Sequence, residues 1–157
     1  MIWDDGKEAT MKKVVRLALM MLVVAPVIHV AIALLLTVTK KIGGEYDMML
    51  YILLIVAAFQ PFVLPILERV QVSNYLRNQQ SRMTPDQFFI SVSTIKFAFV
   101  EAISLYGLVV YMLSGSLTNM LYFYIIALFW SGIYWPRRTK FEDFMQRIES
   151  HAANIIE

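Results

Sequence analysis

The chain has 157 residues, of which 59% are hydrophobic and 17% are charged, and its formal net charge at pH 7 is +2. A water-soluble domain carries about a quarter charged residues, because polar groups must cover its surface. The mean hydropathy of +0.60 therefore indicates a protein that is dissolved in lipid. The small net charge provides no broad cationic face for nucleic acid. The lack of cysteine excludes disulfides, thiolate metal sites and iron–sulfur clusters.

Four apolar stretches are long enough to cross a bilayer, whose hydrocarbon core of about 30 Å requires roughly 20 helical residues. They cover residues 14–39, 48–67, 88–113 and 119–135. The first stretch is longer than the apolar region of a secretory signal, and no small-residue cleavage pattern follows it, so we expect it to be retained. The sequence predicts an all-α, multi-pass membrane protein with a four-helix transmembrane domain over residues 1–136.

Local signals predict how these helices begin, bend and end. Inside the second helix, Pro61 and Pro65 each remove a backbone donor and free a carbonyl one turn earlier. The segment 68–83 is polar but keeps some apolar residues, so we expect the second helix to continue beyond the membrane before it breaks. The sequence TPDQ at Thr84–Gln87 is typical of a helix start, with an N-cap threonine, a proline at the first helical position and a glutamine three residues after the cap. Pro136 closes the fourth helix.

Basic residues gather at one end of the predicted bundle. Eleven lysines and arginines flank the helix ends on that side, whereas the loop between the first and second helices holds only Lys40 and Lys41. The positive-inside rule then predicts that both termini are cytoplasmic. We expect the protein to lie in the inner (cytoplasmic) membrane of a cell.

Residues 137–157 predict a cytoplasmic amphipathic helix. Apolar residues recur at helical spacing between charges that cancel: Phe141, Phe144, Ile148, Ala152 and Ile155. Two interpretations are open, because such a helix either lies on the membrane surface or binds a partner or a second copy of the chain.

Glu101 lies near the middle of the third predicted span, where an ionised carboxylate would cost at least about 2.5 kcal/mol. We expect the carboxyl to be protonated, paired or hydrated, and the loss of water favours a neutral acid that donates one hydrogen bond. Four other residues share its helical face, which we expect to point away from lipid: Thr94, Phe97, Ser104 and Leu108.

Three further polar residues lie in the predicted spans. His29 and Gln60 are predicted at nearly the same depth as Glu101, since His29 and Glu101 differ by about 3 Å at 1.5 Å per residue. They either join Glu101 in a polar cluster built from three helices or hold the helices together through bonds worth about 0.6–2 kcal/mol. Lys96 is well round the helix from Glu101. It either extends to the interface or pairs with a group on a neighbouring helix.

The stretch 97–113, FAFVEAISLYGLVVYML, resembles the second helix of the proteolipid c subunit of rotary ATP synthases, which commonly carries an FVEAL-x-IYGLVV pattern. By position, Glu101 matches the ion-binding carboxylate of that family, and Val100, Ala102 and residues 106–110 match its surroundings. The resemblance implies a carboxylate that carries a proton or a sodium ion. It covers about a ninth of the chain, and the first span departs from that family because it contains no glycine.

Two functions follow from these patterns. In the first, the protein is a small membrane subunit in which Glu101 binds or relays a proton, with Ser104, Gln60 and His29 around it and Lys96 as an accessory charge. In the second, it is a non-transporting structural or assembly subunit held by its helices and its tail. The loops contain no Ser, His and acid set, no metal-ligand cluster and no phosphate-binding glycine loop, so we predict neither an enzyme nor a cofactor. The expected surroundings are lipid and protein partners or further copies of the chain.

Overall fold

The computed structural model describes residues 5–35, 46–77 and 83–153, and these residues form helices without any strand. The elements are α1 (Asp5–Leu19), the π-helical turn η1 (Met20–Val24), α2 (Ala25–Leu35), α3 (Tyr46–Arg77), α4 (Pro85–Ser114), α5 (Leu117–Tyr134) and α6 (Arg138–Ala153). The predicted all-α class is confirmed. Several residues of the predictions lie outside the described ranges: residues 36–39 of the first span, Lys40, Lys41, Arg82 and Ile155.

Four helical rods are long and apolar enough to cross a membrane: Asp5–Leu35, Met48–Arg77, Pro85–Ser114 and Leu117–Tyr134. This finding confirms the four predicted spans and supports a multi-pass membrane protein. Two of the rods are much longer than the apolar stretches within them. The second helix continues to Arg77, as expected from its polar continuation, and the first begins at Asp5.

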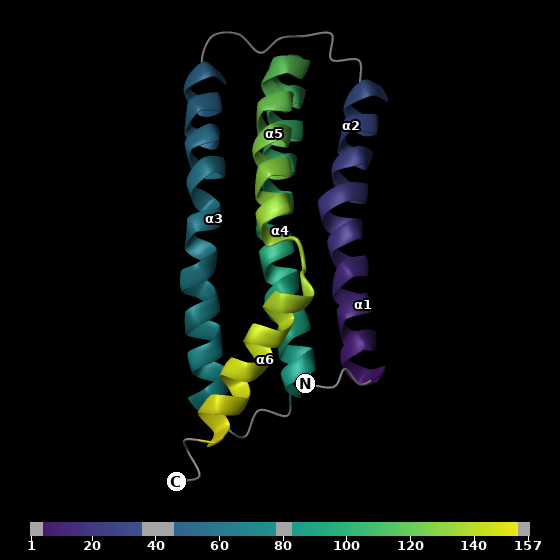
Figure 1. Ribbon diagram of the computed structural model, residues 1–157. Coiled ribbons are helices and arrows are strands. Elements are labelled where there is room, and N and C mark those ends of the chain that lie inside the picture. Colours follow the sequence, from purple (N-terminus) through teal and green to yellow (C-terminus); the bar gives the residue numbers. More distant parts are fainter. Residues whose placement is uncertain (1–4, 36–45, 78–82, 154–157) are drawn as a thin grey trace.

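The first rod consists of α1, η1 and α2 in line (Figure 1). At η1 the backbone N–H of Ala25 donates to the carbonyl of Met20, which is a bond across five residues instead of four. The next residue is Pro26, whose ring has no N–H and would clash with the carbonyl of Leu22 in a regular helix. A wider π turn relieves that clash and keeps the rod continuous.

Local sequence signals set both ends of α4. Thr84 and Gln87 form the predicted capping box, in which the Thr84 hydroxyl accepts from the Gln87 N–H at 3.3 Å and the Gln87 side chain accepts from the Thr84 N–H at 3.2 Å. At the other end Gly115 has a φ of 63°, which favours glycine, and its N–H donates to the carbonyl of Tyr111 at 2.7 Å. Ser116 then caps α5 through the Asn119 N–H.

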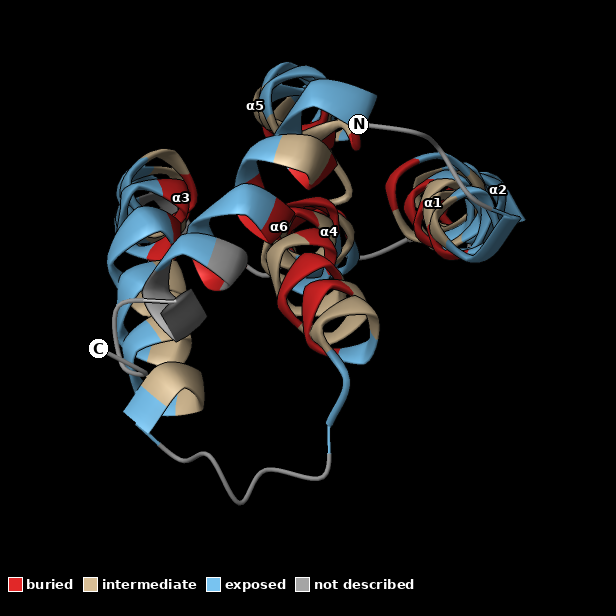
Figure 2. Ribbon diagram, turned by 60° about the horizontal axis from the view of Figure 1, so that its bottom comes forward, coloured by how far each residue is buried: buried red, intermediate tan, exposed pale blue. Residues whose placement is uncertain are grey.

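Helix α4 is the centre of the bundle. Figure 2 shows α3 and the α1–α2 rod on opposite sides of α4, with α5 on a third side. The approach of α5 is close at Gly107, where an added Cβ would lie 3.0 Å from both the Met120 carbonyl oxygen and the Phe123 Cβ. Glycine at this position lets the two backbones pack tightly.

Helix α6 folds back across the lower part of the bundle (Figure 1). Its apolar side chains are buried in one core with residues of α1 and α4: Phe141, Phe144, Met145 and Ile148 with Val14, Phe88, Phe89 and Val92. The ring of Phe89 makes edge contacts with Phe141 and Phe144, at centroid distances of 4.8 and 5.1 Å. The sequence predicts that the apolar side of α6 contacts a membrane surface or a partner. In the structure, α1 and α4 of the same chain cover these side chains instead.

Candidate functional site

Helix α5 is the shortest of the four candidate spans. Its 18 residues extend about 27 Å, close to the thickness of a bilayer core of about 30 Å. Helix α4 runs antiparallel to α5, and Phe97 of α4 lines the same cavity as Tyr134 at the end of α5. The part of α4 from Phe97 to Ser114 therefore lies beside α5, while the part before Phe97 packs against α6.

Glu101 is half-buried on α4, four residues or about 6 Å beyond Phe97. Within the candidate span Pro85–Ser114 it lies close to the middle, as expected. Among the described residues, none makes an ion pair or a hydrogen bond with the Glu101 carboxyl.

The helical face that carries Glu101 is divided between core and surface. Phe97 and Ser104 are buried, whereas Glu101, Thr94 and Leu108 are half-buried. Glu101 borders a stripe of exposed residues at helical spacing on α4: Ala98, Leu105, Val109 and Met112. None of the five residues on this face is exposed, and Glu101 lies at the edge of the exposed stripe.

The structure brings His29 and Ser104 together across the α2–α4 contact. Ser104 is fully buried, and its Oγ lies 3.3 Å from the His29 Nδ1. The hydroxyl proton of Ser104 is donated to the backbone carbonyl of Glu101 at 2.8 Å. Because a hydroxyl has only one proton, its oxygen is left to accept from Nδ1 of His29, which places the ring proton on that nitrogen. Ser104 thus links His29 to the backbone of Glu101 and not to its carboxyl.

Gln60 lies on the other side of α4. Its Nε2 donates to the carbonyl of Phe99 at 3.0 Å, which ties α3 to α4. Its Oε1 is buried and has no hydrogen-bond partner among the described residues. Since α2 and α3 flank α4 on opposite sides (Figure 2), the structure does not gather His29 and Gln60 into one cluster.

The hydroxyl of Tyr134 binds the carbonyl of Pro61, which lacks a helical donor because residue 65 is proline. Pro65 has no N–H, so the carbonyl of Pro61, four residues earlier, lacks its helical donor. The hydroxyl of Tyr134 donates to this carbonyl at 2.9 Å and joins α5 to α3. The freed carbonyl was predicted from the sequence, but its partner was missed because the two residues are 73 positions apart.

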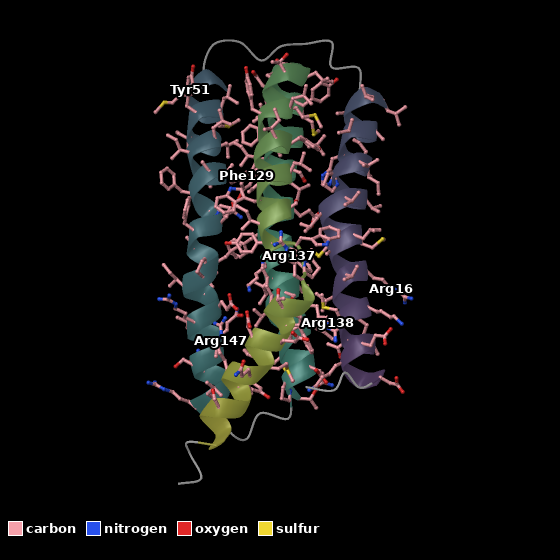
Figure 3. The ribbon with its side chains drawn as sticks, viewed as in Figure 1. Arg16, Tyr51, Phe129, Arg137, Arg138 and Arg147 are labelled. Carbon is pink, nitrogen blue, oxygen red and sulfur yellow. The ribbon has the colours of Figure 1, made fainter. Side chains whose placement is uncertain are left out.

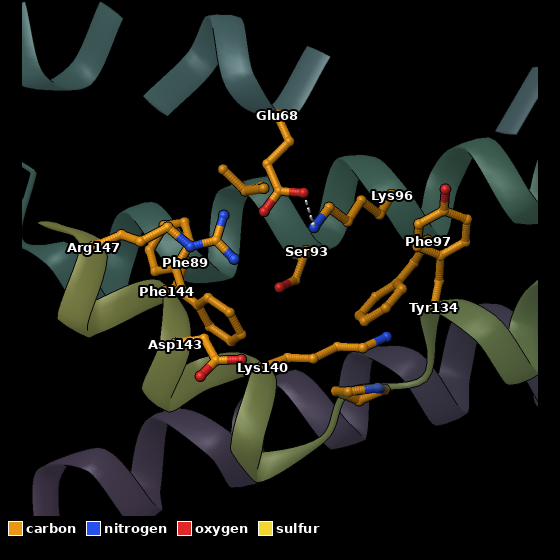
Figure 4. Close-up of a pocket in the computed structure, with 12 residues that line it drawn as sticks. Glu68, Phe89, Ser93, Lys96, Phe97, Tyr134, Lys140, Asp143, Phe144 and Arg147 are labelled. Atoms are coloured by element: carbon orange, nitrogen blue, oxygen red, sulfur yellow. Dashed lines mark ion pairs between the residues drawn. The ribbon is translucent and has the colours of Figure 1, made fainter. Parts of the chain in front are cut away.

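Lys96 forms an ion pair with Glu68 of α3, with 2.8 Å between Nζ and Oε2. The two side chains are 22% and 27% exposed, so the pair is largely shielded from solvent. Of the two alternatives for Lys96, the structure has the one in which it pairs with a neighbouring helix. The pair lines a cavity of about 240 Å³ between α3, α4 and α6 (Figure 4).

Three residues of α6 complete the polar lining of this cavity: Lys140, Asp143 and Arg147. The Lys140 ammonium donates to the carbonyl of Ile133 at 2.5 Å. Burial lowers the pKa of Lys140, and the positive charges of Arg137 and Lys96 lower it further, with Glu68 acting in the opposite direction. The sequence did not predict this group of residues, since it depends on α6 folding back.

Comparison with protein-family models, with curated proteins and with solved structures finds no match for this chain. The likeness of residues 97–113 to the ATP synthase c subunit thus remains a local resemblance in sequence. Within the described ranges, no three His, Cys, Asp or Glu side chains gather in a way that could hold a metal ion.

Proposed function

We propose that the protein is a small subunit of a membrane complex in which Glu101 binds and releases a proton. The observation that carries this proposal is the position of a carboxyl on a membrane-spanning helix without an ion pair or hydrogen bond to any described residue. A carboxylate there would cost at least about 2.5 kcal/mol, which the neutral acid avoids. The charge of Glu101 therefore depends on whether water or a partner reaches it.

The neighbours of Glu101 support different roles from those expected. His29 of α2 contacts Ser104, which lies about one turn beyond Glu101 on α4. The imidazole of His29 is a second group that can carry a proton. Gln60 positions α3 against α4. Lys96 forms its ion pair with Glu68, so we do not propose it as an accessory charge for Glu101.

We further propose that the end of the bundle with α6 faces the cytoplasm. Figure 3 shows Arg16, Arg138 and Arg147 in this half, with Tyr51 near the opposite end. Positive charge near the ends of spans favours the cytoplasmic side. The resemblance of residues 97–113 to an ion-binding helix supports the assignment of Glu101 independently of this orientation.

A test of proton binding needs only the purified chain in lipid nanodiscs. A hydrophobic carbodiimide adds to a protonated carboxylic acid, so we expect mass spectrometry to find the label on Glu101 and to find less of it as pH rises. Differential proton titration should show one group fewer in Glu101→Gln than in the unchanged chain. Glu8→Gln is the matched control for the labelling, because Glu8 is 56% exposed and paired with Lys12, so its loss should leave the label on Glu101 unchanged. A Glu101 that stays unlabelled at every pH would refute the proposal.

A second candidate, an assembly subunit, is favoured by the exposed stripe of α4 that Glu101 borders. In that function a partner helix covers the stripe, and Glu101→Gln is nearly silent because an amide also donates a hydrogen bond. Val109→Trp should then release the partner from the complex purified in mild detergent, while Ile125→Trp on the outer face of α5 should not. Removal of the chain after Pro136 is not a clean test, since α6 covers the core.

A further inference from the structure

The cavity beside α6 has a mixed lining that suits a small charged group. It lies where α5 ends and the chain turns through Pro136 into α6. Aromatic rings of Phe89, Phe97 and Phe144 form part of its wall. Its volume of about 240 Å³ is below the roughly 300–1,000 Å³ of pockets for drug-sized ligands, which favours an occupant the size of a lipid headgroup.

Positive charge in the cavity exceeds negative charge. Lys96 is balanced by Glu68, which leaves Asp143 against Lys140 and Arg147. The guanidinium of Arg147 makes no ion pair or hydrogen bond with a described residue, and Figure 4 shows it turned toward the cavity. The bond that Lys140 makes is to a neutral carbonyl. Burial is the main cause of the lowered pKa of Lys140, and the charges of Arg137 and Lys96 lower it further.

Ser93 provides an independent sign of a ligand. This residue is only 6% exposed, and its hydroxyl has no hydrogen-bond partner among the described residues. Figure 4 shows its oxygen directed into the cavity. The oxygen is not among the fully buried polar atoms, so it is open to the cavity and free to donate to an occupant. An acceptor in the cavity would satisfy it.

We propose that this cavity binds a phosphate-bearing anion, with Lys140 and Arg147 neutralising its charge and the Ser93 hydroxyl donating to it. Lys96 stays paired with Glu68 and adds attraction at longer range. The cavity lies at the end of α5, beside Tyr134 and Pro136, and α5 is long and apolar enough to span a membrane. Basic pockets between membrane helices suit anionic headgroups. The site is separate from Glu101 and does not depend on its function.

The experiment uses the full chain in detergent, titrated with phosphatidylglycerol and with phosphatidylcholine of the same acyl chains and followed by native mass spectrometry. A third titration, with glycerol 3-phosphate followed by calorimetry, distinguishes a lipid headgroup from a soluble phosphate. Both lipids carry the phosphate, but Lys140 and Arg147 would repel the choline ammonium of phosphatidylcholine. We therefore expect phosphatidylglycerol to bind about tenfold more tightly. Binding of glycerol 3-phosphate would show that the site also takes the soluble anion.

The variants identify the residues. Arg147→Gln and Lys140→Gln should each weaken binding of the anion about five- to tenfold, and Ser93→Ala should weaken it several-fold without changing any charge. The matched control is Lys13→Gln with Arg16→Gln, which removes two exposed charges of α1 and should change binding by less than about twofold. If a charge variant fails to fold, Ser93→Ala carries the test. Equal binding of the two lipids, or an equal loss in the α1 control, would overturn the proposal.

Discussion

Replacement of Tyr134 by phenylalanine tests how this fold handles prolines inside a membrane helix. The change removes one oxygen and keeps the ring, which stacks on Trp130 at a centroid distance of 5.9 Å. It leaves the carbonyl of Pro61 without the donor at 2.9 Å and without a helical donor, because residue 65 is proline. Hydrogen bonds between membrane helices contribute about 0.6 kcal/mol on average and up to about 1.7. We expect a loss near the upper end, about 1–1.5 kcal/mol, because Pro61 is buried.

Pro65→Ala makes the prediction specific. An alanine at 65 restores the N–H that bonds to the Pro61 carbonyl, so the tyrosine hydroxyl is no longer its only donor. Pro65 is exposed, so the smaller side chain opens no cavity in the core. In this background Tyr134→Phe should cost only about 0.5 kcal/mol, which gives a coupling of about 0.5–1 kcal/mol between the two positions.

The measurement is reversible unfolding in mixed micelles, with increasing sodium dodecyl sulfate and far-ultraviolet circular dichroism as the signal. The four proteins of the cycle are compared with Tyr122→Phe, an exposed tyrosine of α5 whose change should stay within about 0.5 kcal/mol. If Tyr134→Phe costs the same with proline and with alanine at 65, the carbonyl freed by Pro65 is not what the hydroxyl stabilises.

Three further predictions concern stability under the same assay. Gly107→Ala should cost about 1–3 kcal/mol, because the added Cβ would lie 3.0 Å from the Met120 carbonyl oxygen. Gly132→Ala is the control and should be neutral or stabilising, because a Cβ there would meet nothing within 4 Å. Equal effects of the two changes would contradict the close approach of α4 and α5. Thr84→Ala should cost about 1 kcal/mol through loss of the N-cap, while Thr84→Ser should restore most of it. The pKa of Lys140 is lower in the folded chain than in the unfolded chain, so the unfolded chain binds more protons at pH values just below 10.5. The free energy of unfolding should therefore rise with pH in that range. Lys140→Gln should flatten this rise, and an unchanged slope in the variant would refute the prediction.

Features that depend on neighbouring residues could be predicted from the sequence. The four apolar stretches, the capping box at Thr84 and the ending of α4 at Gly115 each follow from a few consecutive residues. The carbonyl freed by Pro65 follows from one missing donor. Each of these signals acts within a turn or two of helix, where no other part of the chain changes the outcome.

Features that depend on α6 could not be predicted in this way. Helix α6 covers the apolar side chains of Phe88, Phe89 and Val92. Hydropathy alone does not distinguish such buried residues from residues that face lipid. The sequence therefore predicts the third span but not that its first residues pack beneath α6. The cavity residues come from four helices whose packing has no local sequence pattern, so the sequence shows Lys140 and Arg147 only as charges of the C-terminal segment.

The π turn at η1 has a consequence for the register of the whole first rod. Over the 19 steps from Val14 to Ala33 an ideal α-helix would rotate about 1,900°, which would leave these two residues about 100° apart around the axis. A turn that accommodates one extra residue takes back about 100°, so both fall on the side that faces α4, where both are fully buried. The turn thus acts as a one-residue insertion in the helical register. Buried residues before and after it therefore lie on the same side of the rod and face α4 along its whole length.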